Sequence, residues 1–346
     1  MTSGTGARVI VAGAGVTGLT VALALAKAGA RVTVCDPAPL GRNASGVAAG
    51  MLAPAFETAL DPLAAGHFAL LKEGRDLWPP LADEIGIALD RSGAVARGEA
   101  AWLAEVSQRL GAVGAEHIVT DDGVFSPEDW RLDSGAALAA LRAVAEHEGV
   151  AFIAAELTDL AAGPGGVRVR LGGGEMQALV CDAVVLATGW RGAFAPEEAH
   201  LSPIKGHILK LASLLPPGPV VRGDGVYLCP TAEGLVVGAT MEAGVFSAHV
   251  DPAQVMALRA AGAKLLPEVA KAPAAIETGV RAATPDGLAL VGHSSLPGLI
   301  LASGLRRNGW LLAPLVAEMV TAYVLGRDPG PWARLFDPRR FDTPET

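Results

Sequence analysis

Three glycines near the start of the chain have the spacing of a phosphate-binding turn. Gly13, Gly15 and Gly18 form the pattern G-x-G-x-x-G between an apolar run and a stretch rich in Ala and Leu. The first glycine permits a tight turn, the second lets the backbone approach a pyrophosphate, and the third lets helix and strand pack closely. Asp36 stands 18 residues after Gly18, where its carboxylate can accept a hydrogen bond from a ribose hydroxyl. These residues predict a dinucleotide-binding site.

The elements that must position this motif surround it. Residues 8–12 form a short β-branched run suited to a buried parallel strand, and residues 19–28 have Leu and Ala at helical spacing. Gly29 closes this helix, and residues 31–36 form a second strand. The sequence therefore predicts a strand, a turn, a helix and a strand, in which the helix N-terminus offers N–H groups to the phosphates.

The choice between NAD and FAD depends on later segments. Residues 184–189 and 299–304 are apolar runs that end in small residues, where the backbone could approach a long cofactor. A nicotinamide enzyme would be expected to carry a proton-handling His or Lys in its second domain. The seven His form no H-x-H or H-x-x-x-H pair, and no G-x-S-x-G occurs. These observations favour FAD and predict neither a metal site nor a serine hydrolase.

The composition is that of a globular protein of about two domains. Of the 346 residues, 51% are hydrophobic and 18% are charged, which excludes an intrinsically disordered chain. A net charge of −9 without a basic run argues against nucleic acid as a partner. Cys35, Cys181 and Cys229 lie too far apart for a disulfide framework or a zinc site. We expect a cytoplasmic protein and leave open whether it is a homo-oligomer.

One uncharged stretch, residues 9–26, has nearly the length of a membrane span. The glycines of the phosphate-binding pattern split it into a short β-rich piece and a helix. No A-x-A cleavage site followed by a polar segment, as at the start of a mature secreted protein, occurs after this stretch. We therefore expect neither an integral membrane span nor a secretory leader.

Hydrophobic spacing predicts the remaining elements. Helices are expected at residues 70–89, 100–110, 132–148, 251–265 and 311–325. Strands are expected at 167–171, 178–180, 183–189, 225–229, 234–238 and 299–302, with a turn at 172–174. Because sheet-forming segments recur at both ends and in the middle, a nucleotide-binding domain interrupted by a second domain is the expected organisation.

Several further segments carry a family resemblance. Gly279-Val-Arg-Ala-Ala-Thr-Pro-Asp-Gly287 is similar to a family pattern Gly-Leu-Arg-Pro-x-Thr-Pro-Asp-Gly, and Arg307-Asn-Gly-Trp-Leu-Leu-Ala-Pro314 to Arg-Asn-Gly-Ile-Leu-Leu-Ala-Pro. Other similar segments are Ala44-Ser45 with residues 48–54, Pro203-Ile-Lys-Gly-His207 (family Pro-Val-Lys-Gly-Gln), Tyr227-Leu-Cys-Pro230 and Val236-Val-Gly-Ala-Thr-Met241. Nearly end to end, the chain resembles the D-amino-acid-oxidase family of FAD enzymes, most of all the glycine oxidases of thiamine biosynthesis.

This resemblance implies an α/β fold. A doubly wound FAD-binding domain of the glutathione-reductase Rossmann type would carry an inserted substrate domain built on a mixed antiparallel sheet. The FAD-binding domain is expected to comprise residues 1–80, 145–200 and 280–346, and the substrate domain residues 81–144 and 201–279. The FAD is expected to be non-covalent, since no Cys lies in the C-terminal third, where some relatives attach it.

The resemblance also assigns substrate-binding residues. Arg281 would clamp the substrate carboxylate, with the hydroxyl of Tyr227 beside it, because a guanidinium fork can hold a carboxylate bidentately. Met51 and Met241 would line a small pocket over the flavin. Arg307 would bridge to the substrate or stabilise reduced flavin, together with the positive end of the last helix.

The cofactor-contacting residues are assigned in the same way. They are expected to be Gly13, Gly15, Val16, Thr17, Gly18, Asp36, Ala44, Ser45, Ala49, Gly50, Met51, Leu157, Thr188, Gly189, Arg307, Asn308, Gly309, Trp310 and Leu311.

Two positions depart from the family pattern. Leu305-Arg306 stands where relatives have a His followed by an aromatic residue, which adds a cation near the expected pocket. A pocket-facing Arg306 would suit a larger or more acidic amine, and an Arg306 paired with a surface acid would have no such effect. Asn43 precedes Ala44 where an acidic residue is commoner.

The expected function is oxidative deamination of a small amino acid, glycine or a close relative. A hydride would pass from Cα to flavin N5 without a side-chain acid or base, and oxygen would be the acceptor. The products would be an imine or 2-oxo acid, ammonia and hydrogen peroxide, and a role in thiamine thiazole biosynthesis follows from the resemblance. The alternatives are a dehydrogenase that passes electrons to a quinone or carrier, an NAD-dependent reductase, and a non-catalytic flavin-fold module.

Overall fold

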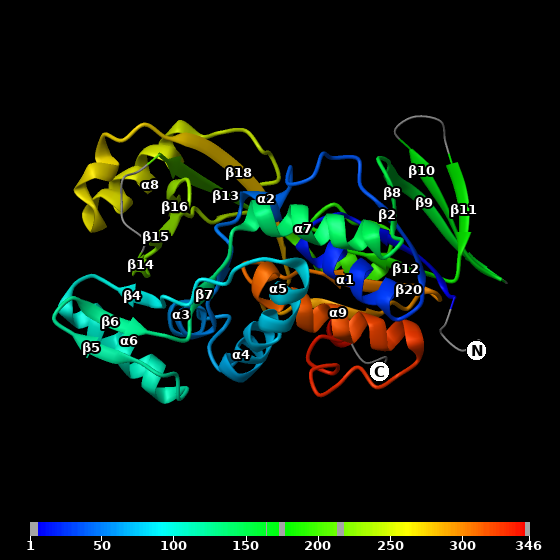
Figure 1. The fold of residues 1–346 in the computed structure, drawn as a ribbon, viewed down its shortest axis with the longest axis horizontal. Coiled ribbons are helices and arrows are strands. Elements are labelled where there is room, and N and C mark those ends of the chain that lie inside the picture. Colours follow the sequence, from blue (N-terminus) through cyan, green and yellow to red (C-terminus); the bar gives the residue numbers. More distant parts are fainter. Residues whose placement is uncertain (1–5, 164, 173–176, 213–217, 343–346) are drawn as a thin grey trace. The chain divides into compact units, whose positions relative to one another are not determined.

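The computed structural model describes residues 6–163, 165–172, 177–212 and 218–342, which divide into two compact units (Figure 1). The first unit comprises residues 1–46, 135–203 and 281–346, and the second comprises residues 47–134 and 204–280. The sequence placed the first boundary at residue 80 instead of 46. Residues 54–60 belong to the second unit because their helix packs on residues 100–112 and because Glu57 pairs with Arg222.

The first unit is built on a six-stranded sheet in the order β19-β20-β12-β1-β2-β8. All neighbours are parallel except β19, which lies antiparallel to β20 at one edge. The strands are β1 (Arg8–Ala12), β2 (Arg31–Cys35), β8 (Ala151–Ile153), β12 (Ala183–Leu186), β19 (Leu290–His293) and β20 (Leu299–Ser303). Ala12 is in register with both Cys35 and Leu186, so the segments after β1, β2 and β12 leave the sheet at one edge.

Both faces of this sheet are covered, which is why its strands read as continuous apolar runs. On one face Ile10, Val184 and Leu186 pack against Val167 and Leu171 of a three-stranded antiparallel sheet. That sheet consists of β9 (Glu156–Gly163), β10 (Gly166–Gly172) and β11 (Gln177–Cys181). Part of the predicted turn at 172–174 lies outside the described residues.

Helices supply the other layer of the first unit. They are α1 (Val16–Lys27), α2 (Ala44–Val47, which ends at the boundary), α7 (Ser134–His147) and α9 (Gly309–Leu325). The short η1 (Pro196–His200) and η3 (Pro338–Phe341) contact each other, and Phe341 of η3 packs on the core shared with the three-stranded sheet. Helix α1 packs along α9 and against β1. Gly326 ends α9 in the left-handed conformation at φ 65°, as its place in the sequence predicts. Pro314 lies inside α9.

The second unit is built on a nine-stranded sheet. Eight strands follow the order β17-β13-β16-β15-β14-β4-β6-β5, and β18 pairs with β13. The strands are β4 (Ala94–Ala96), β5 (Ile118–Thr120), β6 (Gly123–Ser126), β13 (Ser202–Leu211), β14 (Val220–Gly223), β15 (Val226–Thr231), β16 (Gly234–Gly238), β17 (Glu242–Ala243) and β18 (Ala275–Ala283). The sheet is mixed, because β14 and β4 are parallel whereas β15, β16 and β13 are antiparallel neighbours.

Helices flank the sheet of the second unit. They are α3 (Pro54–Leu60), α4 (Phe68–Asp76), α5 (Trp78–Ile85), α6 (Ala100–Ala112), α8 (Pro252–Leu265) and η2 (Pro267–Ala270), and a two-stranded ribbon joins β3 (Met51–Leu52) to β7 (Trp130–Arg131). The single helix predicted at 70–89 is wrong, because the chain breaks at Leu77 into α4 and α5. Pro79 and Pro80 explain the break, since proline is accommodated in the first turn of a helix and not in its interior.

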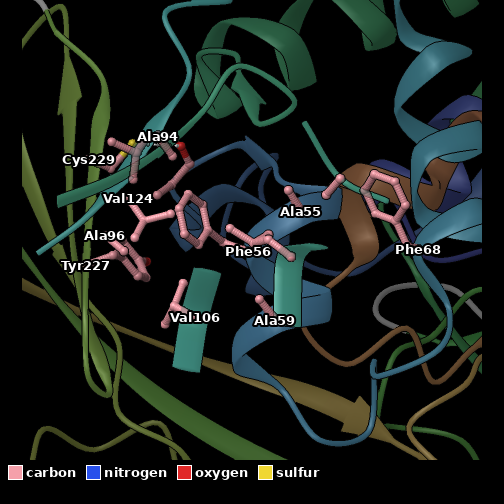
Figure 2. Close-up of a cluster of buried hydrophobic side chains, with 14 of the residues drawn as sticks. Ala55, Phe56, Ala59, Phe68, Ala94, Ala96, Val106, Val124, Tyr227 and Cys229 are labelled. Atoms are coloured by element: carbon pink, nitrogen blue, oxygen red, sulfur yellow. Dashed lines mark hydrogen bonds between the residues drawn. The ribbon is translucent and has the colours of Figure 1, made fainter. Parts of the chain in front are cut away.

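The core of the second unit gathers around Phe56 (Figure 2). Phe56 is fully buried among small residues of α3 and side chains of the sheet, including Val124. Burying one such side chain stabilises the fold by roughly 1.5–3 kcal/mol. Tyr227 belongs to the same cluster at 8% exposure, so a predicted pocket residue is anchored in the core.

None of the described helices is long and apolar enough to cross a membrane. The uncharged stretch at residues 9–26 forms β1, the glycine turn and α1 instead. All three cysteines are buried and carry no disulfide. Burial raises the pKa of the Cys35 thiol to about 12 and that of the Cys181 and Cys229 thiols to about 11, so all three stay protonated at neutral pH.

Candidate functional site

The glycine turn follows β1 directly, and close backbone contacts require glycine at two of its three glycine positions. Gly13 adopts φ 110°, and a Cβ placed on it would lie 2.3 Å from the carbonyl oxygen of Ala187. A Cβ on Gly18 would lie 2.0 Å from the carbonyl oxygen of Gly13, so only glycine lets α1 approach the turn. At Gly15 a Cβ would instead lie 3.1 Å from Ser45 Oγ, a side-chain atom. A side chain at Gly15 would therefore crowd Ser45 and not the backbone of the turn.

Asp36 lies beside this turn at the end of β2. Its Oδ2 accepts from the backbone N–H of Ala14 at 2.8 Å, and its Oδ1 accepts from that of Ala38 at 2.8 Å. These bonds fix the plane of the carboxylate. Each oxygen keeps a further lone pair for a hydroxyl donor.

Ser45 lies at the N-terminus of α1. Its Oγ accepts from the backbone N–H of Val16 at 3.1 Å. Asn43 Oδ1 accepts from the backbone N–H groups of Ser45 and Gly46, at 3.0 and 3.1 Å, which orders the segment that presents Ser45. Asn43 thus caps the segment that begins α2 through its side-chain oxygen, as an acidic side chain could in the same place.

The N-terminus of α9 lies beside that of α1. Trp310 Nε1 donates to the backbone oxygen of Ser45 at 3.0 Å, and a Cβ on Gly309 would contact Val16 Cγ1 at 3.9 Å. Each helix leaves backbone N–H groups and the positive end of its dipole at this edge of the sheet. The pair of termini is therefore suited to an anionic or electron-rich group.

Three arginines come together where β18 meets the turn before α9. The backbone N–H of Arg306 donates to the oxygen of Ala282 at 2.8 Å, and Leu305 forms a bridge with Ala283, so Arg281, Arg306 and Arg307 belong to one local structure. All three arginines are half-buried. Arg306 has φ 51°, the one positive φ found outside glycine in the described part of the chain. A side chain there costs about 1 kcal/mol in strain.

The remaining predicted pocket residues lie in the second unit. Tyr227 on β15 lays its ring over Gly238 of β16, where an added Cβ would come within 2.2 Å of the phenol oxygen. Met51 begins β3 and is half-buried, whereas Met241 is 39% exposed. Ala49 and Gly50 also belong to this unit.

Comparison with known proteins decides the family. Residues 8–323 match the family described as FAD dependent oxidoreductase. The chain belongs to this family. It is 31% identical over 361 residues to the glycine oxidase of Geobacillus kaustophilus, covering 91% of this chain and 92% of that protein. It is 32% identical over 370 residues to the glycine oxidase of Pseudomonas aeruginosa, covering 94% and 98%.

The fold comparison agrees. The crystal structure of the Geobacillus kaustophilus glycine oxidase superposes with a TM-score of 0.86 at 26% identity, covering 97% of this chain and 100% of that one. The chain is also 30% identical over 375 residues to the bifunctional protein ThiO/ThiG of Trichormus variabilis, but spans only 55% of that relative's length. The predicted fold class, family and FAD cofactor are therefore confirmed.

The edge described above fits FAD. Thr188 Oγ1, just after β12, is buried and makes no hydrogen bond of normal geometry among the described residues, although Thr188 acts as a hydrogen-bond partner of the Glu198 carboxyl that opposes the rise of its pKa on burial. A buried hydroxyl in this position needs a polar partner. The paired termini of α1 and α9 would supply positive potential for a pyrophosphate and a flavin, and the missing side chain at Gly15 would let the backbone approach the pyrophosphate. Asp36 would accept from the ribose.

Several of the predicted FAD residues are placed differently from the rest. The side chain of Leu157 is 5% exposed and belongs to the core between the two sheets of the first unit, so only its main chain is free to reach a cofactor. Leu311 is likewise buried in the core at 1% exposure.

Among the described residues, no group of three or more His, Cys, Asp or Glu could hold a metal ion.

The sequence analysis missed a buried network around His207. The ring is fully buried, and its Nε2 accepts from the backbone N–H of Asp251 at 2.9 Å, so Nδ1 carries the proton. Nδ1 donates to Glu242 Oε1 at 2.9 Å, and Thr240 Oγ1 accepts from the backbone N–H of His207 at 2.8 Å. His207 thus holds the residues on both sides of Met241. The only signal in the sequence was a His where relatives carry Gln.

Proposed function

We propose that the chain oxidises the Cα–N bond of a small amino acid, glycine or a close relative. The observation that carries this proposal is the 31–32% identity, over nearly full length, to two proteins named glycine oxidase. With glycine, oxygen and water as reactants, the products are glyoxylate, ammonia and hydrogen peroxide. The two electrons that leave the substrate then end on oxygen.

The arginines of the first unit supply the binding chemistry. Arg281 holds the substrate carboxylate through its guanidinium fork, which fixes the direction of the Cα–H bond. Arg307 adds positive charge at the start of α9. Bound FAD supplies the acceptor for the hydride that leaves Cα. The substrate ammonium loses a proton to solvent water before this transfer, so that the amine is neutral and no side-chain acid or base is needed.

In the second unit, Tyr227, Met51 and Met241 define the size of the substrate. The Tyr227 hydroxyl offers a hydrogen bond to a carboxylate, and the two thioethers form an apolar wall that excludes long side chains. A small pocket of this kind favours glycine, sarcosine or D-alanine. A role in forming the thiazole of thiamine is part of the proposal, supported by the similarity to ThiO/ThiG over 55% of that protein's length.

The experiment measures oxygen uptake, peroxide and 2-oxo acid with purified protein carrying FAD. Glycine, sarcosine, D-alanine and D-aspartate are compared at equal concentration. The proposal predicts oxygen uptake that matches 2-oxo acid formation, with a small substrate best. Substrate oxidation that proceeds with a quinone but not with oxygen would instead assign a dehydrogenase, and no oxidation with either acceptor would contradict the proposed function.

A further inference from the structure

We propose that Arg222 is a positioning residue for the substrate pocket, holding Met51 and Tyr227 in the orientation that admits a small amino acid. This inference rests on the proposed function for the roles of Met51 and Tyr227. The contacts that carry it all lie within the second unit.

Arg222 contacts Met51 directly. It lies on β14 at 2% exposure, and its Nη1 is 3.3 Å from Met51 Sδ. Its Nη2 donates to Glu57 Oε1 of α3 at 2.7 Å. A methionine side chain has three rotatable bonds and fills irregular space readily, so it needs a specific partner to hold one rotamer. A cation that donates to the sulfur is such a partner.

Arg222 is also the cross-strand neighbour of Tyr227. The two residues are directly opposite in the antiparallel pair β14 and β15, so their side chains leave the sheet on the same face. Tyr227 in turn is pressed against Gly238 on its other neighbour, β16. Tyr227 thus lies in the sheet between Arg222 on β14 and Gly238 on β16, and the Arg222 side chain contacts Met51 as well.

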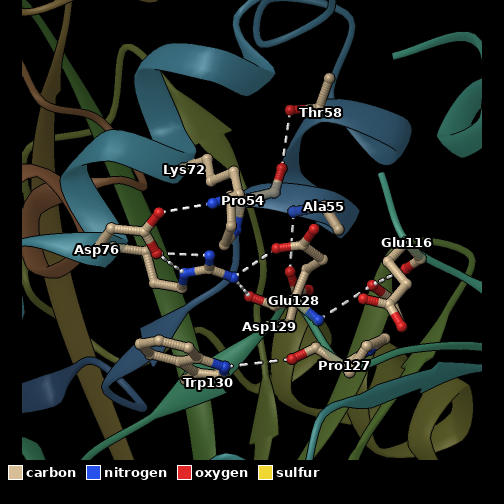
Figure 3. Close-up of polar contacts among 12 residues, drawn as sticks. Pro54, Ala55, Thr58, Lys72, Asp76, Glu116, Pro127, Glu128, Asp129 and Trp130 are labelled. Carbon is tan, nitrogen blue, oxygen red and sulfur yellow. Dashed lines mark hydrogen bonds and ion pairs between the residues drawn. The ribbon is translucent and has the colours of Figure 1, made fainter. Parts of the chain in front are cut away.

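The cation is held by two buried acids. Glu57 pairs with it, and the carboxyl of Asp129 acts on it electrostatically. Asp129 also accepts from the backbone N–H of Ala55, as Figure 3 shows, and from that of Phe56. Burying such a group costs several kcal/mol per ion, and an apolar side chain of equal size would stabilise the fold as well or better. The Arg222 guanidinium instead contributes a defined orientation, because its hydrogen bonds to Met51 Sδ and to Glu57 fix Met51 relative to α3.

A second buried arginine of the same unit provides a matched control. Arg75 on α4 is 4% exposed and contacts Asp76 at 2.5 Å, Glu128 at 2.6 Å and the ring of Trp130 (Figure 3). None of these partners is a predicted pocket residue. Arg222→Lys and Arg75→Lys therefore make the same chemical change to a buried ion pair, and only the first removes the contact to Met51.

The first readout does not depend on activity. The protein contains six methionines, and labelling their methyl carbons with 13C gives one NMR signal for each, with Met51 assigned through Met51→Leu. The inference predicts that Arg222→Lys shifts or broadens the Met51 signal whereas Arg75→Lys leaves it in place. An unchanged Met51 signal in folded Arg222→Lys overturns the inference, whatever the substrate proves to be.

The second readout separates positioning from general destabilisation. In Arg222→Lys with full FAD content we expect KM for glycine to rise about tenfold with kcat changed less, and the preference for glycine over D-alanine to narrow. Arg75→Lys should keep both values. Equal kinetic changes in the two variants would overturn the positioning role. A wild-type protein that oxidises no amino acid would contradict the proposed function and leave the NMR result to decide the inference.

If Arg222→Lys does not fold, a double variant replaces it. Glu57→Gln with Arg222→Met removes the Glu57–Arg222 pair together, so that Glu57 is not left as an unpaired buried charge, and Asp129 keeps its two backbone N–H donors. The inference predicts a stable protein with a shifted Met51 signal and a raised KM. A stable double variant with the wild-type signal and KM would overturn it.

Discussion

Gly15 is the residue at which the cofactor site can be tested without disturbing the fold. An added side chain there meets only the side-chain atom Ser45 Oγ, whereas at Gly13 or Gly18 it would meet backbone. We expect Gly15→Val to fold but to purify without yellow colour, because the side chain fills the space of the pyrophosphate. The check is FAD released on acid denaturation, with Gly111→Val on α6 as a control that should keep its FAD. Full FAD content in Gly15→Val would refute the assignment.

Arg281 tests the substrate clamp. Arg281→Ala should retain FAD but lose about 3 kcal/mol of substrate stabilisation, since one partner of a charge-assisted pair is removed. Arg281→Lys should recover little, because a point charge cannot reproduce the bidentate fork. The measurement is kcat/KM for the best amino acid, and a wild-type value in Arg281→Ala would mean that the carboxylate is bound elsewhere.

Arg306 tests the departure from the family pattern. Its left-handed backbone and half-buried side chain belong to the same local structure as Arg281 and Arg307. If the guanidinium faces the substrate, neighbouring cations favour an additional anionic group, so Arg306→Ala should lower activity with D-aspartate more than with glycine. Steady-state rates with both substrates decide this. If glycine is the best substrate and Arg306→Ala has the same rates as wild type, Arg306 does not contact the substrate and its departure from the family pattern is a surface variation.

At the scale of elements, the contact between Asp129, just before β7, and the N-terminus of α3 makes the free energy of unfolding depend on pH. Asp129 precedes β7 and accepts from the first N–H groups of α3. Burial raises its pKa to about 7, although Arg222 and these N–H groups oppose the rise. Between about pH 4 and 7 the folded state therefore holds a proton that the unfolded chain has lost, and stability falls as pH rises, by up to about 4 kcal/mol.

Urea unfolding at several pH values tests this contact between Asp129 and α3. Wild type should lose stability from pH 5 to 7 relative to Asp129→Asn, whose side chain cannot titrate. Asp129→Asn should be less stable than wild type at pH 5 by about 1–2 kcal/mol, because an amide cannot accept from both N–H groups. Identical pH slopes in the two proteins would show that Asp129 is ionised in the folded state throughout.

The elements themselves show how far local sequence patterns reach. Strand β1, the glycine turn and α1 were predictable because the glycine spacing and the apolar runs are local signals. The break at Leu77 was also encoded locally, in Pro79 and Pro80. The helix over Pro314 was predicted from its apolar run, and packing of α9 along α1 stabilises a proline position that propensity alone disfavours.

At the scale of the whole molecule, the two-unit organisation was predictable but its first boundary was not. Residues 47–80 follow a nucleotide-binding segment without a linker, and their place in the second unit depends on partners far along the chain, such as Arg222 and Asp129. The His207 and Arg222 networks depend in the same way on strands that pair only in the folded sheet. Cofactor residues could be proposed from a motif because the glycine turn is local, whereas the contact of Arg222 with Met51 and the His207 network beside Met241 could not be foreseen.

The central claim is that this chain binds FAD and reduces it with a small amino acid. The most direct measurement is the flavin absorbance of purified protein during anaerobic titration with glycine, repeated with sarcosine, D-alanine and D-aspartate. We predict a yellow protein whose flavin band bleaches with at least one of them, and much more slowly in Arg281→Ala. A colourless protein, or a yellow one that no amino acid bleaches, would contradict the claim.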